Sequence, residues 1–366
     1  MLLQRRWAIA TLASAVLLAT WLLPLRSGLA ASDAPNPVAS ASLSDLNASP
    51  VGSPGLTATL AFVSDSRVAV LACDGIGGAL ACRLALIDYR QESLRPVSGL
   101  ELQPGSRKSL LPVRGGCLLL REVWGNVTTL FSADLKSSVN LSMNVVPSPS
   151  FGSVIGDYKS GTWALYKIDA LRTELIREGH GELQSVSDSV ALFREGDVIH
   201  VESLDGRKSS AMAVSKCGGM RVEPAGPDHL FVEGCGDGGT IRGLNWGFIR
   251  SIAEPPGWGG RHGWTSDGGR ILFDHYTRTV SASERSLEAL AAAATLGLGS
   301  ANEQANGERI QVIDTKTGGV CFDWDSKLKP LGLAGEYHAD ISPSGGLVAV
   351  VGWGKLMIYR MPNTCP

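Results

Sequence analysis

Short apolar runs that end in a polar residue recur along the chain at a nearly constant interval. The two clearest are RLALID at 83–88 and RIQVID at 309–314. Weaker copies fit the same frame at 129–134, 164–169, 198–203, 240–245 and 355–360. From Asp88 to Arg360 is 272 residues, which makes six steps of about 45 residues each. A fixed period of this length predicts one supersecondary unit that is used repeatedly.

A second pattern precedes the runs and predicts a β-hairpin. DISPSGGLVAVV at 340–351 places a Ser-Pro-Ser-Gly-Gly turn before an apolar strand, and WTSDGGRILF at 264–273 repeats it. VSDSRVAVL at 63–71 and VSDSVALF at 186–193 are looser copies. Small residues at a tight turn, followed by β-branched and apolar residues, favour a hairpin. VIDTKTGG at 312–319 adds a further turn after the run, so each unit has four antiparallel strands, as in a propeller blade.

These motifs resemble the WD40-like and YVTN-type β-propeller repeats of exported bacterial proteins. The resemblance rests on SDGGRILF, VIDTKTGG and the terminal SPSGGLVAVVGWGKLMIYRM, and it covers roughly residues 56–365. It implies an all-β fold, a seven-bladed β-propeller of four-stranded antiparallel blades. The blades are expected at 56–98, 99–141, 142–184, 185–224, 225–263, 264–335 and 336–366. Propellers host binding proteins as well as enzymes, so the fold alone implies no reaction.

The sixth predicted blade is too long, and the excess lies at about 276–308. Ser281-Ala-Ser-Glu284 is a possible capping box, the Ala-rich SLEALAAAATL favours a helix, and Gly297 ends it. We therefore expect a short helical insertion. It would lie over the pore as a lid, contact a second subunit, or be a tolerated surface insertion.

The first 55 residues differ in composition from the repeats. Arg5 and Arg6 precede an apolar run at 7–25, and small residues at 28 and 30 favour cleavage before Ala31. Residues 1–30 are therefore expected to be a signal peptide, with an uncleaved N-terminal anchor as the alternative. Residues 31–55 are rich in Ala, Ser and Pro and predict a flexible linker. Residues 48–56 look too short and too rich in Pro and Gly to complete the last blade, so ring closure stays open.

Charge and cysteine content restrict the class of protein. The formal net charge of the 366 residues is −2, so no basic field attracts nucleic acid. The expected localisation is secreted or periplasmic, where disulfides form. Three pairs are candidates, the first across a hairpin: Cys73 with Cys82, Cys217 with Cys235, and Cys321 with Cys365. The seventh cysteine, Cys117, lies in an apolar run and is interpreted as a buried thiol.

The usual catalytic and cofactor motifs are missing from the sequence. It has no His-Glu-Xaa-Xaa-His, no Gly-Xaa-Ser-Xaa-Gly, no phosphate-binding loop and no Cys-Xaa-Xaa-Cys. GCGDGG at 234–239 matches the letters of a dinucleotide loop, but a strand follows it where a helix is required, so a β-turn is favoured. No two of the six His are three or four residues apart. We predict no cofactor and no metal.

The ligand is expected on the face formed by the turns between second and third strands and by the connections between blades. Aromatic, Arg and His side chains at this pore mouth could stack on and hydrogen-bond a ligand. The candidates are Trp124, Tyr158, Arg194, Trp258, Arg261, His262, Trp264, His275, Tyr276 and Trp353. The favoured hypothesis is a binding or interaction module for a protein or glycan, without catalysis and with no membrane contact except through an uncleaved N-terminal segment. The alternative is a lyase or hydrolase that uses His275, Arg261 or His262.

Overall fold

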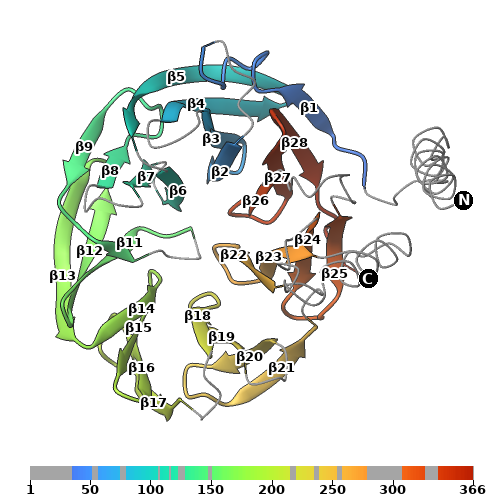
Figure 1. The fold of residues 1–366 in the computed structure, drawn as a ribbon. Coiled ribbons are helices and arrows are strands. Elements are labelled where there is room, and N and C mark those ends of the chain that lie inside the picture. The colour runs from blue at the N-terminus through green and yellow to red at the C-terminus, as the bar shows by residue number, and fades with distance from the viewer. Residues whose placement is uncertain are drawn as a thin grey trace, which may run out of the picture. The chain divides into compact units, whose positions relative to one another are not determined.

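The structure is a computed structural model. It describes residues 35–51, 57–74, 80–105, 108–114, 117–122, 128–146, 151–214, 220–234, 239–253, 258–277, 307–325 and 337–365. These residues form 28 strands in seven four-stranded antiparallel sheets, as a seven-bladed propeller requires. Figure 1 shows the sheets of residues 35–365 arranged in a ring. Within the described part of the chain there is no helix, and therefore none that could span a membrane.

The first four sheets follow the chain without interruption. The first contains β2 (Thr57–Ser64), β3 (Arg67–Asp74), β4 (Leu80–Arg90) and β5 (Ser93–Gly105). The second contains β6 (Lys108–Val113), β7 (Cys117–Glu122), β8 (Thr128–Phe131) and β9 (Ser138–Leu141). The third contains β10 (Val145–Val146), β11 (Val154–Lys159), β12 (Thr162–Asp169) and β13 (Arg172–His180). The fourth contains β14 (Glu182–Val186), β15 (Val190–Glu195), β16 (Val198–Ser203) and β17 (Ser209–Ala213).

The remaining sheets use the rest of the chain and one strand from its beginning. The fifth contains β18 (Arg221–Pro224), β19 (His229–Glu233), β20 (Gly239–Gly243) and β21 (Phe248–Ile252). The sixth contains β22 (Trp258–Trp264), β23 (Arg270–Thr277), β24 (Gly307–Asp314) and β25 (Val320–Asp325). The seventh has the order β1 (Ala39–Ser42), β28 (Lys355–Arg360), β27 (Leu347–Gly352) and β26 (His338–Ile341).

The repeat inferred from the apolar runs is confirmed. All seven runs coincide with the third strand of a sheet, which is β4, β8, β12, β16, β20, β24 or β28. The second strands are buried on both faces: in β3 every residue from Val68 to Cys73 is buried. The outer strand β13 is instead mostly exposed. The second strands therefore have continuous apolar sequences, because neighbouring sheets cover both of their faces.

The last sheet is completed by the N-terminal strand β1, in a segment that we expected to be a flexible linker. Ala39 pairs with Ile358 and Ser42 with Lys355 in an antiparallel register. Leu43, Leu46 and Ala48, which follow the strand, are buried in the core between the seventh and first sheets. The prediction was wrong for these residues because a few apolar positions and one edge strand suffice to order a segment of polar composition. The ring is closed by both ends of the chain.

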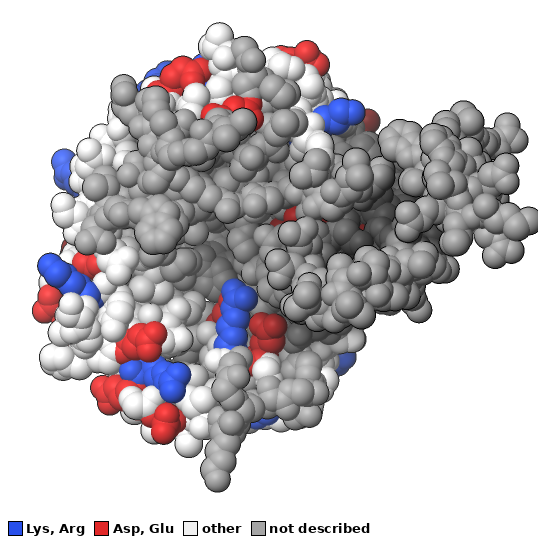
Figure 2. Space-filling view, in the orientation of Figure 1, with Lys and Arg blue, Asp and Glu red and all other residues white. Residues whose placement is uncertain are grey.

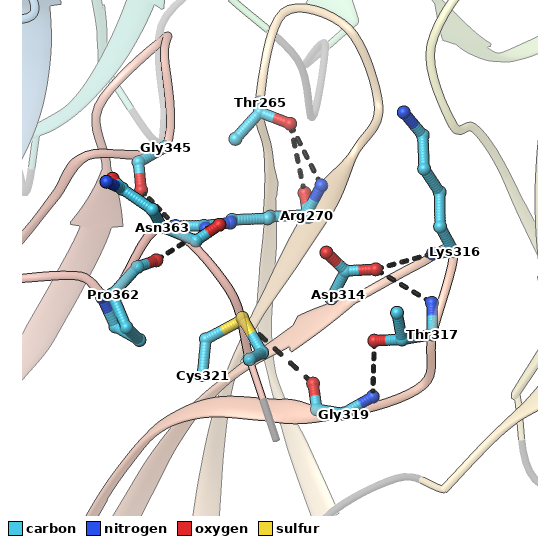
Figure 3. The surroundings of a disulfide bond; sticks show 11 residues. Thr265, Arg270, Asp314, Lys316, Thr317, Gly319, Cys321, Gly345, Pro362 and Asn363 are labelled. Atoms are coloured by element: carbon cyan, nitrogen blue, oxygen red, sulfur yellow. Dashed lines mark hydrogen bonds between the residues drawn. A yellow bond between two sulfur atoms is a disulfide. The ribbon is translucent and has the colours of Figure 1, made fainter.

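A disulfide fixes the C-terminal end beside the same sheet. Cys365 is bonded to Cys321 of β25, with Cα atoms 4.6 Å apart, as predicted. Figure 3 shows the neighbouring Arg270, whose guanidinium donates to the carbonyls of Gly345 at 2.6 Å and Pro362 at 2.7 Å. The chain end is therefore held to the sixth and seventh sheets by a covalent bond and by hydrogen bonds.

Other sequence predictions have mixed outcomes. The Cys73–Cys82 bond is present and joins paired residues of β3 and β4. Cys217, Cys235 and the side chain of Cys117 lie outside the described residues, as does the predicted helix. The strands β23 and β24 extend two residues into each end of the expected insertion at 276–308. The boundary between the fifth and sixth blades was also wrong, because residues 258–264 form a strand of the sixth sheet and not a connecting loop.

Candidate functional site

The antiparallel order of each sheet gives the ring two chemically different faces. We call the loop face the side that holds the turns between second and third strands and the connections between sheets. The turn face holds the turns between first and second strands and those between third and fourth strands. Since all seven sheets have the same strand order, corresponding turns lie on the same face. The candidates chosen from the sequence were all expected on the loop face.

Three of those candidates are interior residues instead. His262 and Trp264 lie in β22 and His275 lies in β23, and all three are buried. We expected His262 and Trp264 in a connection between blades because glycines interrupt the apolar pattern of PGWGGRHGW, and His275 in a turn between second and third strands. The backbones of Trp258, Arg261 and Tyr276 belong to the same two strands, while their side chains, like all of Trp124, lie outside the described residues.

The buried residues form a polar contact between the fifth and sixth sheets, centred on Glu223 of β18. Its Oε2 accepts a hydrogen bond from Trp264 Nε1 at 3.2 Å and lies 3.1 Å from His262 Nδ1. Its Oε1 is 2.5 Å from Nη2 of Arg221. Burial opposes ionisation of Glu223, but the bonds from His262 and Trp264 and the charges of His262 and Arg221 outweigh it, so its pKa lies below the ordinary value.

Aromatic rings surround this contact and separate it from solvent. Phe231 meets His262 edge-on at 5.3 Å and Trp264 at 5.6 Å. The side chain of His262 is 1% exposed and that of Glu223 is 6% exposed. A substrate cannot reach His262 as it lies in this structure, so the predicted acid–base role for this residue is not supported. We interpret the contact as a buried polar network that holds two sheets together.

The other described candidates are on the loop face but do not converge. Tyr158 packs against the core between the third and fourth sheets. Arg194 is engaged locally, with its Nε donating to the carbonyl of Gly196 at 2.7 Å. Trp353 is exposed in a two-residue turn in which it and Gly354 both have positive φ. Each belongs to a different sheet. Whether these side chains bind a ligand stays a prediction.

The turn face holds a pocket that the sequence did not indicate. It has a volume of about 520 Å³, within the range of ordinary ligand pockets. Residues from turns and strand ends of the seventh, first, second and third sheets line it. These residues are Val63, Ser64, Asp65, Ser66, Arg67, Arg90, Ala133, Phe151 and Pro343.

The two arginines of the pocket share one partly covered carboxylate, that of Asp88. Arg90 Nε lies 2.7 Å from Asp88 Oδ2, and Arg67 Nε lies 4.0 Å from Asp88 Oδ1. The side chains of Arg90 and Arg67 are 66% and 36% exposed, against 14% for Asp88. Asp65, on the pocket wall, accepts the backbone N–H of Ser344 at 2.8 Å. The pocket therefore presents guanidinium groups outward, while Asp88 is largely covered and Asp65 is exposed with only its Oδ1 bonded.

Hydrogen bonds between neighbouring sheets fix the turns around the pocket. The hydrogen bond from the Ser344 N–H to Asp65 joins the seventh sheet to the first. Ser98 Oγ donates to the carbonyl of Asp134 at 2.9 Å, and this bond joins the first sheet to the second. The backbone N–H of Arg114 donates to the carbonyl of Gly152, beside Phe151, at 2.6 Å. The pocket walls therefore come from four sheets but are tied to one another, which favours a preformed site.

From the sequence, the pocket residues are expected only to form hairpin turns. Ser64, Asp65 and Ser66 form the turn of VSDSRVAVL, where small polar residues have a sufficient structural reason. Arg90 follows a repeat run at the end of β4. The one available signal was that arginine occurs at both hairpin ends of the same sheet, at 67 and 90, and only the fold shows that these ends meet.

Charged side chains do not gather into one patch on the face that Figure 2 shows, and the described part of the chain has no metal-binding cluster. Figure 2 shows the described acidic and basic side chains interspersed on the face toward the viewer. Among the described residues, no group of three or more His, Cys, Asp or Glu side chains could hold a metal ion.

Comparisons with known proteins concern the architecture. No protein-family model and no curated protein sequence matches the chain. Similar solved structures include the WD40 repeats of RRP9, with 11% identity over 90% of this chain and 99% of that chain, at a TM-score of 0.49. A chain of the mitotic checkpoint complex has 11% identity over 89% of this chain and 91% of its own, at a TM-score of 0.49. Sqt1 from Chaetomium thermophilum has 11% identity over 89% and 98%, at a TM-score of 0.46. At such low identity, these similarities say nothing of what the chain binds.

Proposed function

We propose that this chain is a non-catalytic, exported propeller of the WD40-like or YVTN type that binds a partner protein. The observation that carries the proposal is the turn-face pocket, whose walls come from four sheets and are tied together by hydrogen bonds. A rigid ring with a preformed, solvent-accessible pocket is suited to recognition, because little conformational entropy is lost when a partner binds.

The chemistry of the pocket supports a protein ligand more than a glycan. Among the described residues that line the pocket, Phe151 is the single aromatic side chain, whereas sugar recognition would favour several aromatic surfaces. Arginine beside apolar walls is typical of the residues that dominate protein–protein contacts. The loop-face residues Tyr158, Arg194 and Trp353 remain a second predicted surface of the same molecule.

Export is supported by two independent features. The N-terminal 30 residues have the layout of a signal peptide, and two disulfides are present in the ring. Both disulfides join residues that the fold already brings together, so they would reinforce the ring in an oxidising compartment.

Site-specific photo-crosslinking in the native host tests this function. A photo-reactive residue at position 133, in the pocket wall, is expected to capture one defined protein. The same residue at position 207, in a turn of the fourth sheet on the same face, is the control and is expected not to capture it. Equal capture at both positions would contradict the proposal, as would turnover of glycans, peptides or lactones by the purified chain.

A further inference from the structure

We propose that the turn-face pocket recognises a carboxylate of the partner protein, held by Arg67 and Arg90, with adjoining apolar atoms against Phe151 and Pro343. This inference rests on the proposed function and specifies the ligand chemistry. It assigns a binding role to hairpin ends that otherwise have only a structural one.

The proposal rests on hydrogen-bond donors of the two guanidinium groups that are not used within the described residues. Each guanidinium has five N–H donors. Arg90 Nε forms an ion pair with Asp88 Oδ2 at 2.7 Å, and Arg67 Nε is 4.0 Å from the other oxygen of this carboxylate. Neither Nη1 nor Nη2 of these arginines donates a hydrogen bond to another residue in the described ranges. Planar donors that face an open pocket match the two oxygens of a carboxylate.

The carboxylate of Asp65 favours an anion that has a hydrogen-bond donor beside it. Asp65 lines the same pocket, and only its Oδ1 is engaged, by the N–H of Ser344. A phosphate group carries nearly twice the negative charge of a carboxylate, so both its attraction to the two arginines and its repulsion by Asp65 are larger, and charge alone does not select between the two anions. A peptide carboxylate carries one charge, and a neighbouring peptide N–H can donate to Asp65.

The remaining walls fit the apolar part of a peptide. Val63, Ala133, Phe151 and Pro343 contribute apolar surface to the lining. A peptide side chain or a C-terminal residue next to the carboxylate would contact this surface. The volume of about 520 Å³ accommodates a few residues and not a folded domain.

The turn that follows Arg90 has an unusual backbone. Gln91 and Glu92 both have positive φ, at 51° and 58°, where a two-residue hairpin turn normally has Asn and Gly. Such strain persists only where the surrounding structure imposes it. The turn sets the end of β4 and hence the position of the Arg90 side chain.

The test measures retention of fluorescent random hexapeptide pools by the full chain. One pool contains a central Glu and an amidated C-terminus, a second contains Gln instead of Glu, a third contains phosphoserine, and a fourth has a free C-terminal carboxylate and no acidic side chain. We expect the Glu pool or the free C-terminus pool to bind about tenfold more tightly than the Gln pool, with the preference falling as salt rises. The better of these two pools identifies the source of the carboxylate.

Arginine variants connect this preference to the pocket. Arg90→Ala is expected to weaken binding of the preferred pool about tenfold, and Arg90→Lys to weaken it less. Arg207→Ala is the matched control, because Arg207 lies on a corresponding turn of the fourth sheet, 84% exposed and 3.5 Å from Asp205. Thermal unfolding of each variant verifies the fold, and Arg90→Gln substitutes for any variant that unfolds early.

Several outcomes would overturn the inference. They are equal retention of the Glu, Gln and free C-terminus pools, tighter binding of phosphoserine, binding of no pool, or an unchanged preference in Arg90→Ala. Charge-independent binding at the pocket would leave the proposed protein-binding function standing. Failure of crosslinking at position 133 would remove both.

Discussion

The two faces of the ring differ in how their side chains are arranged. On the turn face, residues from four sheets converge on one pocket, and hydrogen bonds between sheets hold them there. On the loop face, the described candidates are separate: Tyr158 packs inward, Arg194 is engaged locally, and Trp353 stands in a turn of the seventh sheet. The binding residues were predicted in the irregular loops, but the pocket is formed by regular hairpin turns.

Both faces exist only while the ring is closed. The largest loss of stability is therefore expected from a change that opens the ring. Deletion of residues 35–48 removes β1 together with the buried Leu43 and Leu46. We expect loss of more than about 5 kcal/mol, comparable to the stability of a whole domain, and loss of both faces. Chemical denaturation measures this, and Leu43→Ala should cost about 3 kcal/mol.

Val51→Ala is the matched control for Leu43→Ala, because Val51 is an apolar residue of the same segment that is 91% exposed. It is expected to leave the free energy of unfolding unchanged. An unaltered unfolding midpoint after the deletion would show that β1 does not close the ring.

The disulfide near the C-terminus should have the next largest effect. Cys365→Ser opens a covalent loop with a sequence separation of 44 residues. Constraint of the unfolded chain by a loop of this size contributes about 2–4 kcal/mol. The variant should unfold at lower denaturant than the oxidised wild type, and Cys321→Ser should match it. Different midpoints for the two variants would indicate that one cysteine has a role outside this bond.

Glu223→Gln disturbs the interior without changing either face. Removing the charge beside His262 and Arg221 should cost about 2 kcal/mol at neutral pH. Because the pKa of Glu223 is lowered from 4.5 on folding, its contribution is present above pH 4.5 and disappears as pH falls through the lower folded value. The stability difference between wild type and variant should therefore shrink in acid. A pH-independent difference would mean that Glu223 is not ionised in the folded protein.

The smallest effect concerns backbone strain beside the pocket. Replacing Gln91 by Asn and Glu92 by Gly supplies the residues that a turn with two positive φ values prefers. We expect a gain of about 1 kcal/mol in the free energy of unfolding with the peptide preference retained. Ser160→Asn, in a turn where Gly161 already follows, is the control and should gain less. A loss of stability in the double variant would show that the ion pair between Glu92 and Arg360, 3.4 Å apart, outweighs the relief of strain.

The architecture was predictable from the sequence because the repeat is local. Runs such as 83–88 and 309–314 report a third strand that neighbouring sheets bury on both faces, and this pattern survives without any knowledge of tertiary contacts. The position of β1 was not predictable, because its pairing partner β28 is more than 300 residues away and its own composition is that of a linker.

The candidate site could not be derived in the same way. His262 and Trp264 looked like loop residues because glycines surround them, and only the partner Glu223, on another sheet, explains their burial. The pocket combines residues 65, 90, 133, 151 and 343, which no local pattern connects. The small polar residues of a hairpin turn are already explained by the turn, so the sequence gives no sign that they also line a pocket.

The central claim is that the turn face binds the partner through Arg90. The most direct test is the affinity of the crosslinked natural partner for Arg90→Ala, Arg207→Ala and Trp353→Ala, measured by titration with the purified full chain. The account predicts a loss of about tenfold for Arg90→Ala and no change for Arg207→Ala. Unchanged affinity of Arg90→Ala, together with a loss for Trp353→Ala, would contradict it and assign binding to the loop face.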